Sequence, residues 1–168
     1  YHFLKKVPSG SATPGRRALS KSYDEINHQA FVDGAKKCDY YTCEIYTHNR
    51  QFFSEVIPNQ QIHFPAEYGY ALIANKWILK SFAGKIGLIG ADAKINLISN
   101  LMKSTQYQEY LGIEKFEDYI FLPQKYACDD IEATEKMVAE QLKKSSSQIF
   151  LMGMGHVKSA LIHRLKKY

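Results

Sequence analysis

Short apolar runs alternate with longer segments of mixed polarity along most of this chain. The clearest runs cover residues 86–89, 119–122 and 149–152, and glycine, proline or polar residues bound each of them. Runs of this length are too short for a buried helix and are typical of strands covered on both faces. The segments between them carry apolar residues three and four positions apart, which predicts amphipathic helices.

Strands that alternate with helices indicate a parallel sheet, because a parallel connection must cross back over the sheet. We therefore expect an α/β fold, a Rossmann-like three-layer sandwich with a largely parallel sheet and helices on both faces. The three runs named above should lie parallel in one sheet. The other expected strands are 39–47 and 62–65, and the expected helices are 24–37, 49–56, 66–82, 92–103, 105–111, 130–144 and 156–167.

The expected helix at 66–82 is the most apolar of the set. Tyr70, Ile73 and Trp77 recur in it at helical spacing, so we expect Trp77 to lie in the core.

Two segments, residues 85–94 and 149–158, share the same order of features: a buried strand, a glycine, a short loop, and a helix with a lysine in its first turns. Parallel strands bring such loops to one sheet edge, where open α/β sheets bind ligands and helix N-termini favour anions. We expect the second loop to contribute more, because it has two glycines and no carboxylate to repel phosphate. The expected ligand-binding residues are Gly90, Asp92, Gly153, Gly155, His156 and Lys158.

Other polar residues extend this candidate site. Arg16 and Arg17 follow a Pro-Gly turn and suit phosphate contact, although they could equally be solvated loop residues. Asp129 and Asp130 stand where a predicted strand leads into a helix. They could contact a ribose or a metal, or Asp129 could simply cap the helix with Glu132 as its reciprocal partner.

His156 completes the set of candidates. It could donate to a phosphate or transfer a proton, and its alternative is to cap its own loop. The candidate catalytic residues are therefore Asp129, Asp130 and His156.

Composition favours one globular domain. The chain has 168 residues, of which 45% are apolar and 23% charged, enough for a sizeable core. We expect a single domain over residues 1–168 with an irregular segment at 1–22, where proline, glycine and serine are frequent. The formal net charge of +5 comes from scattered basic residues, whereas nucleic-acid surfaces need a denser stripe. We therefore expect no nucleic-acid partner.

Cysteine usage and hydropathy set further bounds. The three cysteines, Cys38, Cys43 and Cys128, form no CxxC pair, which indicates neither a zinc site nor a disulfide framework. No run approaches the ~18 apolar residues of a membrane span, and no signal peptide is visible. We expect a cytoplasmic location. Because the chain begins at Tyr1 rather than at methionine, we also expect a fragment of a longer protein.

Residues 86–98, 126–130 and 153–159 together resemble the GT-D-type glycosyltransferase-like domains of bacteria, which occur in surface-polysaccharide and glycoprotein assembly. The resemblance covers the chain from about residue 62 to its end. It implies a Rossmann-like sheet that binds a nucleotide-sugar, a UDP-sugar, and transfers the sugar to a hydroxyl of a glycan or protein acceptor. It also implies further glycosyltransferase domains beside this one.

Catalytic members of that family carry an Asp-Gly-Glu motif near the start of the domain, and this sequence has none. The nearest Asp-x-Glu, Asp130 to Glu132, stands elsewhere and does not inherit that role. The resemblance allows a divalent metal, Mn²⁺ or Mg²⁺, but without the Asp-Gly-Glu motif this sequence gives it no support.

In the transferase interpretation, the two helix N-termini, Arg16 or Arg17 and Lys158 would neutralise the diphosphate leaving group. The alternatives are a non-catalytic domain that binds a nucleotide-sugar or a partner protein, and an unrelated small-molecule enzyme on the same scaffold.

Overall fold

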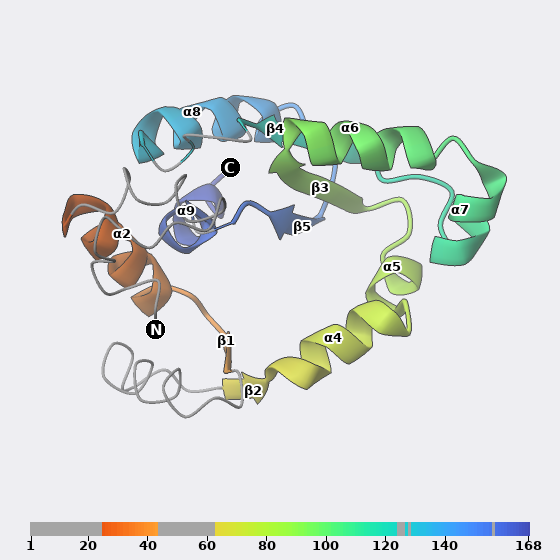
Figure 1. The fold of residues 1–168 in the computed structure, drawn as a ribbon, viewed down its shortest axis with the longest axis horizontal. Coiled ribbons are helices and arrows are strands. Elements are labelled where there is room, and N and C mark those ends of the chain that lie inside the picture. The colour runs from red at the N-terminus through yellow and green to blue at the C-terminus, as the bar shows by residue number, and fades with distance from the viewer. Residues whose placement is uncertain (1–24, 44–62, 124–126, 128, 156) are drawn as a thin grey trace, which may run out of the picture.

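The structure is a computed structural model that describes residues 25–43, 63–123, 127, 129–155 and 157–168. The expected helix at 49–56, the segment 1–22 with Arg16 and Arg17, and His156 lie outside the described residues. The described elements are α2 (Glu25–Lys36), β1 (Tyr41–Cys43), β2 (His63–Pro65), α4 (Ala66–Ala74), α5 (Trp77–Ser81), β3 (Ile86–Ala91), α6 (Asp92–Leu101), α7 (Thr105–Leu111), β4 (Asp118–Leu122), α8 (Ile131–Leu142), β5 (Ile149–Gly153) and α9 (Val157–Leu165) (Figure 1).

The main sheet has three parallel strands in the order β4-β3-β5. Leu88 of the central strand β3 lies level with Tyr119 of β4 and Leu151 of β5. This arrangement confirms the prediction that the three apolar runs form one parallel sheet. The short strands β1 and β2 form a separate parallel pair, with Tyr41 level with His63.

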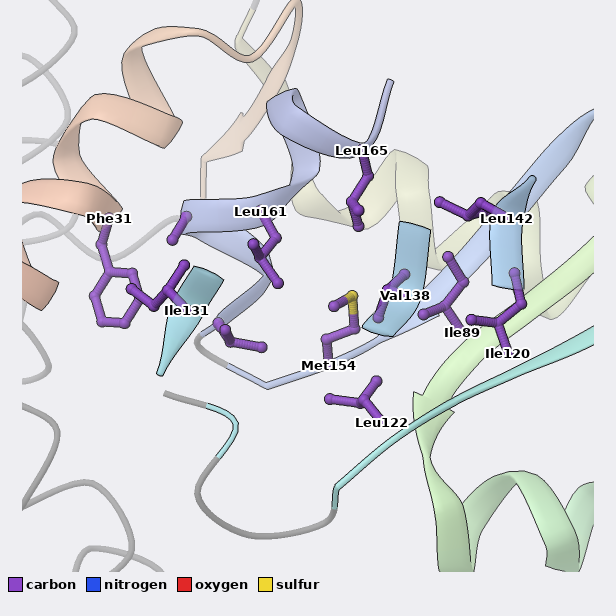
Figure 2. Packing of buried hydrophobic residues seen from close by; sticks show 12 residues of the cluster. Phe31, Ile89, Ile120, Leu122, Ile131, Val138, Leu142, Met154, Leu161 and Leu165 are labelled. Carbon is purple, nitrogen blue, oxygen red and sulfur yellow. The ribbon is translucent and has the colours of Figure 1, made fainter. Parts of the chain in front are cut away.

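Side chains alternate between the two faces of the sheet, as strand geometry requires. Ile89 and Ile120 enter a cluster of buried residues that Val138 of α8 and Leu161 of α9 complete (Figure 2). Leu88 and its neighbours on the opposite face pack instead with Ile95 of α6 and with residues of α5 and α7. Helices therefore cover both faces, which confirms the expected three-layer α/β architecture.

The two edge strands of the sheet, β4 and β5, differ in what covers them. The Gln141 side chain of α8 donates to the carbonyl of Phe121 (2.8 Å) and accepts from its N–H (2.9 Å). This pairing satisfies backbone groups of the edge strand β4 that would otherwise be open. At β5, by contrast, cavities adjoin the edge strand.

The expected continuous helix at 66–82 is wrong. The chain leaves α4 at Asn75, and Lys76 adopts a left-handed conformation with φ of 61°. The Asn75 side chain accepts a hydrogen bond from the Trp77 N–H (3.0 Å) and so supports a new helix start. Asparagine competes with the helical backbone in this way, and the apolar pattern did not reveal it.

The expectation that Trp77 lies in the core is also wrong. The turn redirects α5, so that Leu79 enters the core while 53% of Trp77 stays exposed. Tyr70 and Ile73 of α4 are likewise exposed, at 66% and 56%. Within the described part of the chain, no helix combines the length and the apolarity needed to cross a membrane.

Candidate functional site

The carboxyl ends of β3 and β5 lie side by side, because Gly90 is the register partner of Gly153. After β3 the chain enters α6 at Asp92, and after β5 it enters α9 at Val157. Parallel strands direct both helix N-termini to the same edge of the sheet. The structure therefore brings together the two glycine loops that the sequence singled out.

A cavity of about 620 Å³ runs along the edge strand β5 and reaches the carboxyl ends of β3 and β5, and we call it the carboxyl-edge cavity. Gly90 and Gly153 line it, together with Lys94 from the first turn of α6 and Lys158 from the first turn of α9. The two lysines are the only charged residues among its described lining residues. Since no described carboxylate opposes them, the cavity suits an anion.

The two glycines differ in what a side chain would meet. A Cβ on Gly90 would lie 3.2 Å from Ile95 Cδ1 and 3.4 Å from the Gly153 carbonyl oxygen, which is tight. A Cβ on Gly153 would meet only the Ile89 carbonyl oxygen, at 3.9 Å. Gly155 has a left-handed φ of 61° and is not among the described lining residues. The larger role expected for the second loop stays a prediction, because both loops line the cavity.

Asp92 does not line the carboxyl-edge cavity. Its exposed carboxylate accepts a hydrogen bond from the Ala93 N–H (2.7 Å) at the start of α6. The Asp92 charge therefore complements the helix N-terminus.

Asp129 and Asp130 are also absent from the lining of the carboxyl-edge cavity. Asp130 caps α8, and its carboxylate accepts a hydrogen bond from the Ala133 N–H (2.8 Å). The cap is therefore Asp130 rather than Asp129, which places Glu132 one position too early for a reciprocal capping bond. The loop before the helix is held by Thr134, whose buried hydroxyl donates to the Ala127 carbonyl (2.9 Å).

Replacing Asp130 by alanine should lower the free energy of unfolding by about 1 kcal/mol, because the helix loses its capping acceptor. Asp129→Ala is the matched control, since the Asp129 carboxylate is exposed and does not cap the helix. Urea denaturation of both variants measures the difference. A larger loss in Asp129→Ala would contradict this capping assignment.

The described residues include no cluster of three or more His, Cys, Asp or Glu side chains that could hold a metal ion. Asp130 is engaged as a helix cap, and no described group of carboxylates stands out as ligands for Mn²⁺ or Mg²⁺. We therefore assign no step of a reaction to a metal.

Sequence reasoning did not identify Cys38 and Tyr40, which line the carboxyl-edge cavity from the segment between α2 and β1. Nothing in their local pattern signals a site, since they are far from the glycine loops in sequence. Burial and the nearby Asp39 carboxylate raise the pKa of the Cys38 thiol, against a smaller opposing effect of Lys166. The thiol is therefore neutral near pH 7 and unsuited to act as a nucleophile.

Comparison of the chain with protein-family models, with curated proteins and with solved structures finds no match.

Proposed function

We propose that this protein binds a UDP-sugar in the carboxyl-edge cavity and transfers the sugar to a hydroxyl acceptor, as a GT-D-type glycosyltransferase. The observation that carries the proposal is the lining of the cavity: two glycines, two lysines and no described carboxylate beside two helix N-termini. A volume of about 620 Å³ is in the usual range for small-molecule sites. Neighbouring glycosyltransferase domains belong to the same proposal and rest on the resemblance alone. A cytoplasmic location is proposed with them, from the sequence.

Charge stabilisation is the chemical contribution of these residues. In the transfer, the acceptor oxygen bonds to C1 of the sugar, and the bond from C1 to the diphosphate oxygen breaks. The electron pair leaves with UDP, and the acceptor proton passes to solvent. Lys94, Lys158 and the backbone N–H groups at the starts of α6 and α9 would stabilise the charge that develops on the departing diphosphate.

One observation favours the non-catalytic alternative. Asp129 and Asp130, the described carboxylates proposed for catalysis, do not line the cavity, and Asp130 is engaged as a cap. A domain that binds a nucleotide-sugar without turnover would need only the lysines and the glycine loops. Release of UDP from a UDP-sugar in the presence of acceptor separates the two functions.

The proposal predicts that Gly153→Asp weakens the binding of UDP about tenfold or more. The substitution places a carboxylate beside the phosphates, where like charges repel at short range. A Cβ at Gly153 meets nothing closer than 3.9 Å and the residue is exposed, so the fold should survive. Calorimetry measures the affinity for UDP. UDP at 100 times its dissociation constant should stabilise the wild-type protein by about 2.7 kcal/mol.

Gly69→Asp is the matched control, because it adds the same charge on α4, where a Cβ would meet nothing within 4 Å. Lys158→Gln should weaken UDP binding several-fold, whereas Lys136→Gln, an exposed residue of α8 outside the cavity, should not. Unchanged UDP affinity in a folded Gly153→Asp protein would refute the proposed binding site.

A further inference from the structure

A second cavity, of about 580 Å³, adjoins the first, and we call it the α9 cavity. It lies on the sheet face that carries α8 and α9, between the end of α9, the serine loop before β5 and the segment from Lys37 to Tyr40. The two cavities share a wall along β5. The side chains that line both are Cys38, Tyr40, Ile89, Phe150, Met152 and Ile162.

The described charges of the α9 cavity are mainly basic. Lys37 and Lys166 line it, and Asp39 is the acidic residue among its described lining residues. His163 also lines it but adds little charge near pH 7, because burial and the charges of Lys37 and Arg164 lower its pKa. Asp39 forms an ion pair with Lys166, so these two charges offset one another and Lys37 remains. Tyr168 lines the cavity, and the ammonium group of Lys143 lies 5.4 Å from the centre of its ring. Lys167 lies 4.9 Å from the same ring but forms an ion pair with Glu135 (3.2 Å), so its charge is offset. The cavity therefore presents a positive potential to a ligand.

The rest of the lining suits a sugar ring. Tyr40 presents an aromatic side chain that is 63% exposed, and the exposed Gln148 adds a polar group at the opposite end. A mostly apolar wall with a few convergent polar groups is the usual composition of a small-molecule site.

We propose that the α9 cavity binds a sugar that carries a carboxylate, such as a uronic acid, in the position of the acceptor. The acceptor role rests on the proposed function, because it requires a donor in the adjoining carboxyl-edge cavity. Binding of the carboxylate in the α9 cavity does not depend on the proposed function. Lys37 pairs with the carboxylate, and the sugar ring lies towards Tyr40 and the shared wall.

His163 provides a reporter for this charge. Burial lowers the pKa of His163, and the charges of Lys37 and Arg164 lower it further, while Glu135 and Asp33 act in the opposite direction. Its Nδ1 atom is buried without a hydrogen-bond partner in the described part of the chain. A bound carboxylate near Lys37 would offset part of the positive field and raise this pKa. A neutral sugar of equal size brings no negative charge and would not raise it.

The test compares methyl glucuronide with methyl glucoside, which differ by the carboxylate. Binding is measured by calorimetry on the whole chain, and the pKa of His163 is followed by NMR with and without each sugar. We expect the glucuronide to bind about tenfold more tightly and to raise the pKa of His163. Lys37→Gln should abolish this preference while UDP affinity stays within about twofold.

Lys144→Gln is the matched control, because Lys144 is an exposed lysine that lines neither cavity. Equal binding of glucoside and glucuronide, or no binding of either, would overturn the proposal. Acetate that binds as tightly as the glucuronide would also overturn it, since the site would then recognise an anion and not a sugar. Glucuronide binding without UDP binding would leave the carboxylate site standing and refute the transferase, so the two failures are distinguishable.

Discussion

Replacing Gly34 by alanine is expected to destabilise the protein by about 3 kcal/mol, because α2 and α9 are in backbone contact at this residue. A Cβ on Gly34 would lie 1.7 Å from the Ser159 carbonyl oxygen and 2.8 Å from its carbonyl carbon. Main-chain atoms of a packed helix cannot rotate away, so the two helices would have to separate. Phe31 and Ala35, which are buried on the same helix, would then lose their packing. Urea denaturation measures the loss.

Gly69→Ala is the control for this experiment. Gly69 also lies within a helix, but a Cβ there would meet nothing within 4 Å. Alanine in a helix interior is favoured over glycine, so this variant should gain up to about 1 kcal/mol. If Gly34→Ala proved as stable as the wild type, α2 would not pack against α9 as the structure has it.

The second large effect is expected at Asp118, whose replacement by alanine should lower the free energy of unfolding by about 2 kcal/mol. Asp118 Oδ2 accepts hydrogen bonds from the hydroxyls of Ser145 (2.5 Å) and Ser147 (2.6 Å). It also accepts from the backbone N–H groups of Ser146 (3.1 Å) and Ser147 (3.0 Å). One carboxylate therefore fixes the loop that leads from α8 into β5. Without it, these donors lose their shared acceptor.

The effect of Asp118 should depend on pH. Burial raises the pKa of this carboxyl, but the hydrogen bonds from Ser145, Ser147 and Ser146 together outweigh burial and lower it below the ordinary value of 3.8. A lowered pKa in the folded state gives stability that is present above the pKa of the unfolded chain and is lost as the pH falls through the folded pKa. The difference between wild type and Asp118→Asn should therefore be full near pH 7 and shrink below about pH 4.

Glu117→Gln serves as the control, because this neighbouring carboxylate accepts one hydrogen bond from the Ser146 hydroxyl (3.2 Å) and forms an ion pair with the exposed Lys115 (3.4 Å). Interactions of this exposed kind contribute less than about 1 kcal/mol. Urea denaturation at pH 7 and below pH 4 measures the stability of the Asp118 variants and of Glu117→Gln. A Glu117→Gln loss as large as that of Asp118→Ala would contradict the central role given to Asp118.

Much of the fold was predictable because its signals are local. The run at 86–89 is apolar at every position but one, and it forms the buried centre of the sheet as β3. The parallel orientation of β3, β4 and β5 was predictable from the helices that connect them. The same reasoning gave a wrong prediction for the segment from Ala66 to Phe82. Periodicity shows that one face of a helix is apolar, but it does not show which surface of the protein that face contacts.

The candidate site divides in the same way. Gly90, Gly153 and Lys158 were identifiable because each follows a predicted strand, and parallel strands bring their carboxyl ends to one edge. Asp130 also stands at such an end, but the backbone N–H of Ala133 uses its carboxylate. A strand-to-helix junction in sequence does not reveal whether a carboxylate faces a ligand or its own helix.

The sequence alone determined the elements of the main sheet, their parallel orientation and the two glycine loops, since these depend on residues close together in the chain. Tertiary structure decided that Cys38 and Tyr40 line the cavity beside those loops, and that a second, basic cavity shares their wall. It also decided that α2 packs closely on α9 at Gly34. These features depend on contacts between residues far apart in the sequence, which no local pattern of apolar and polar residues encodes.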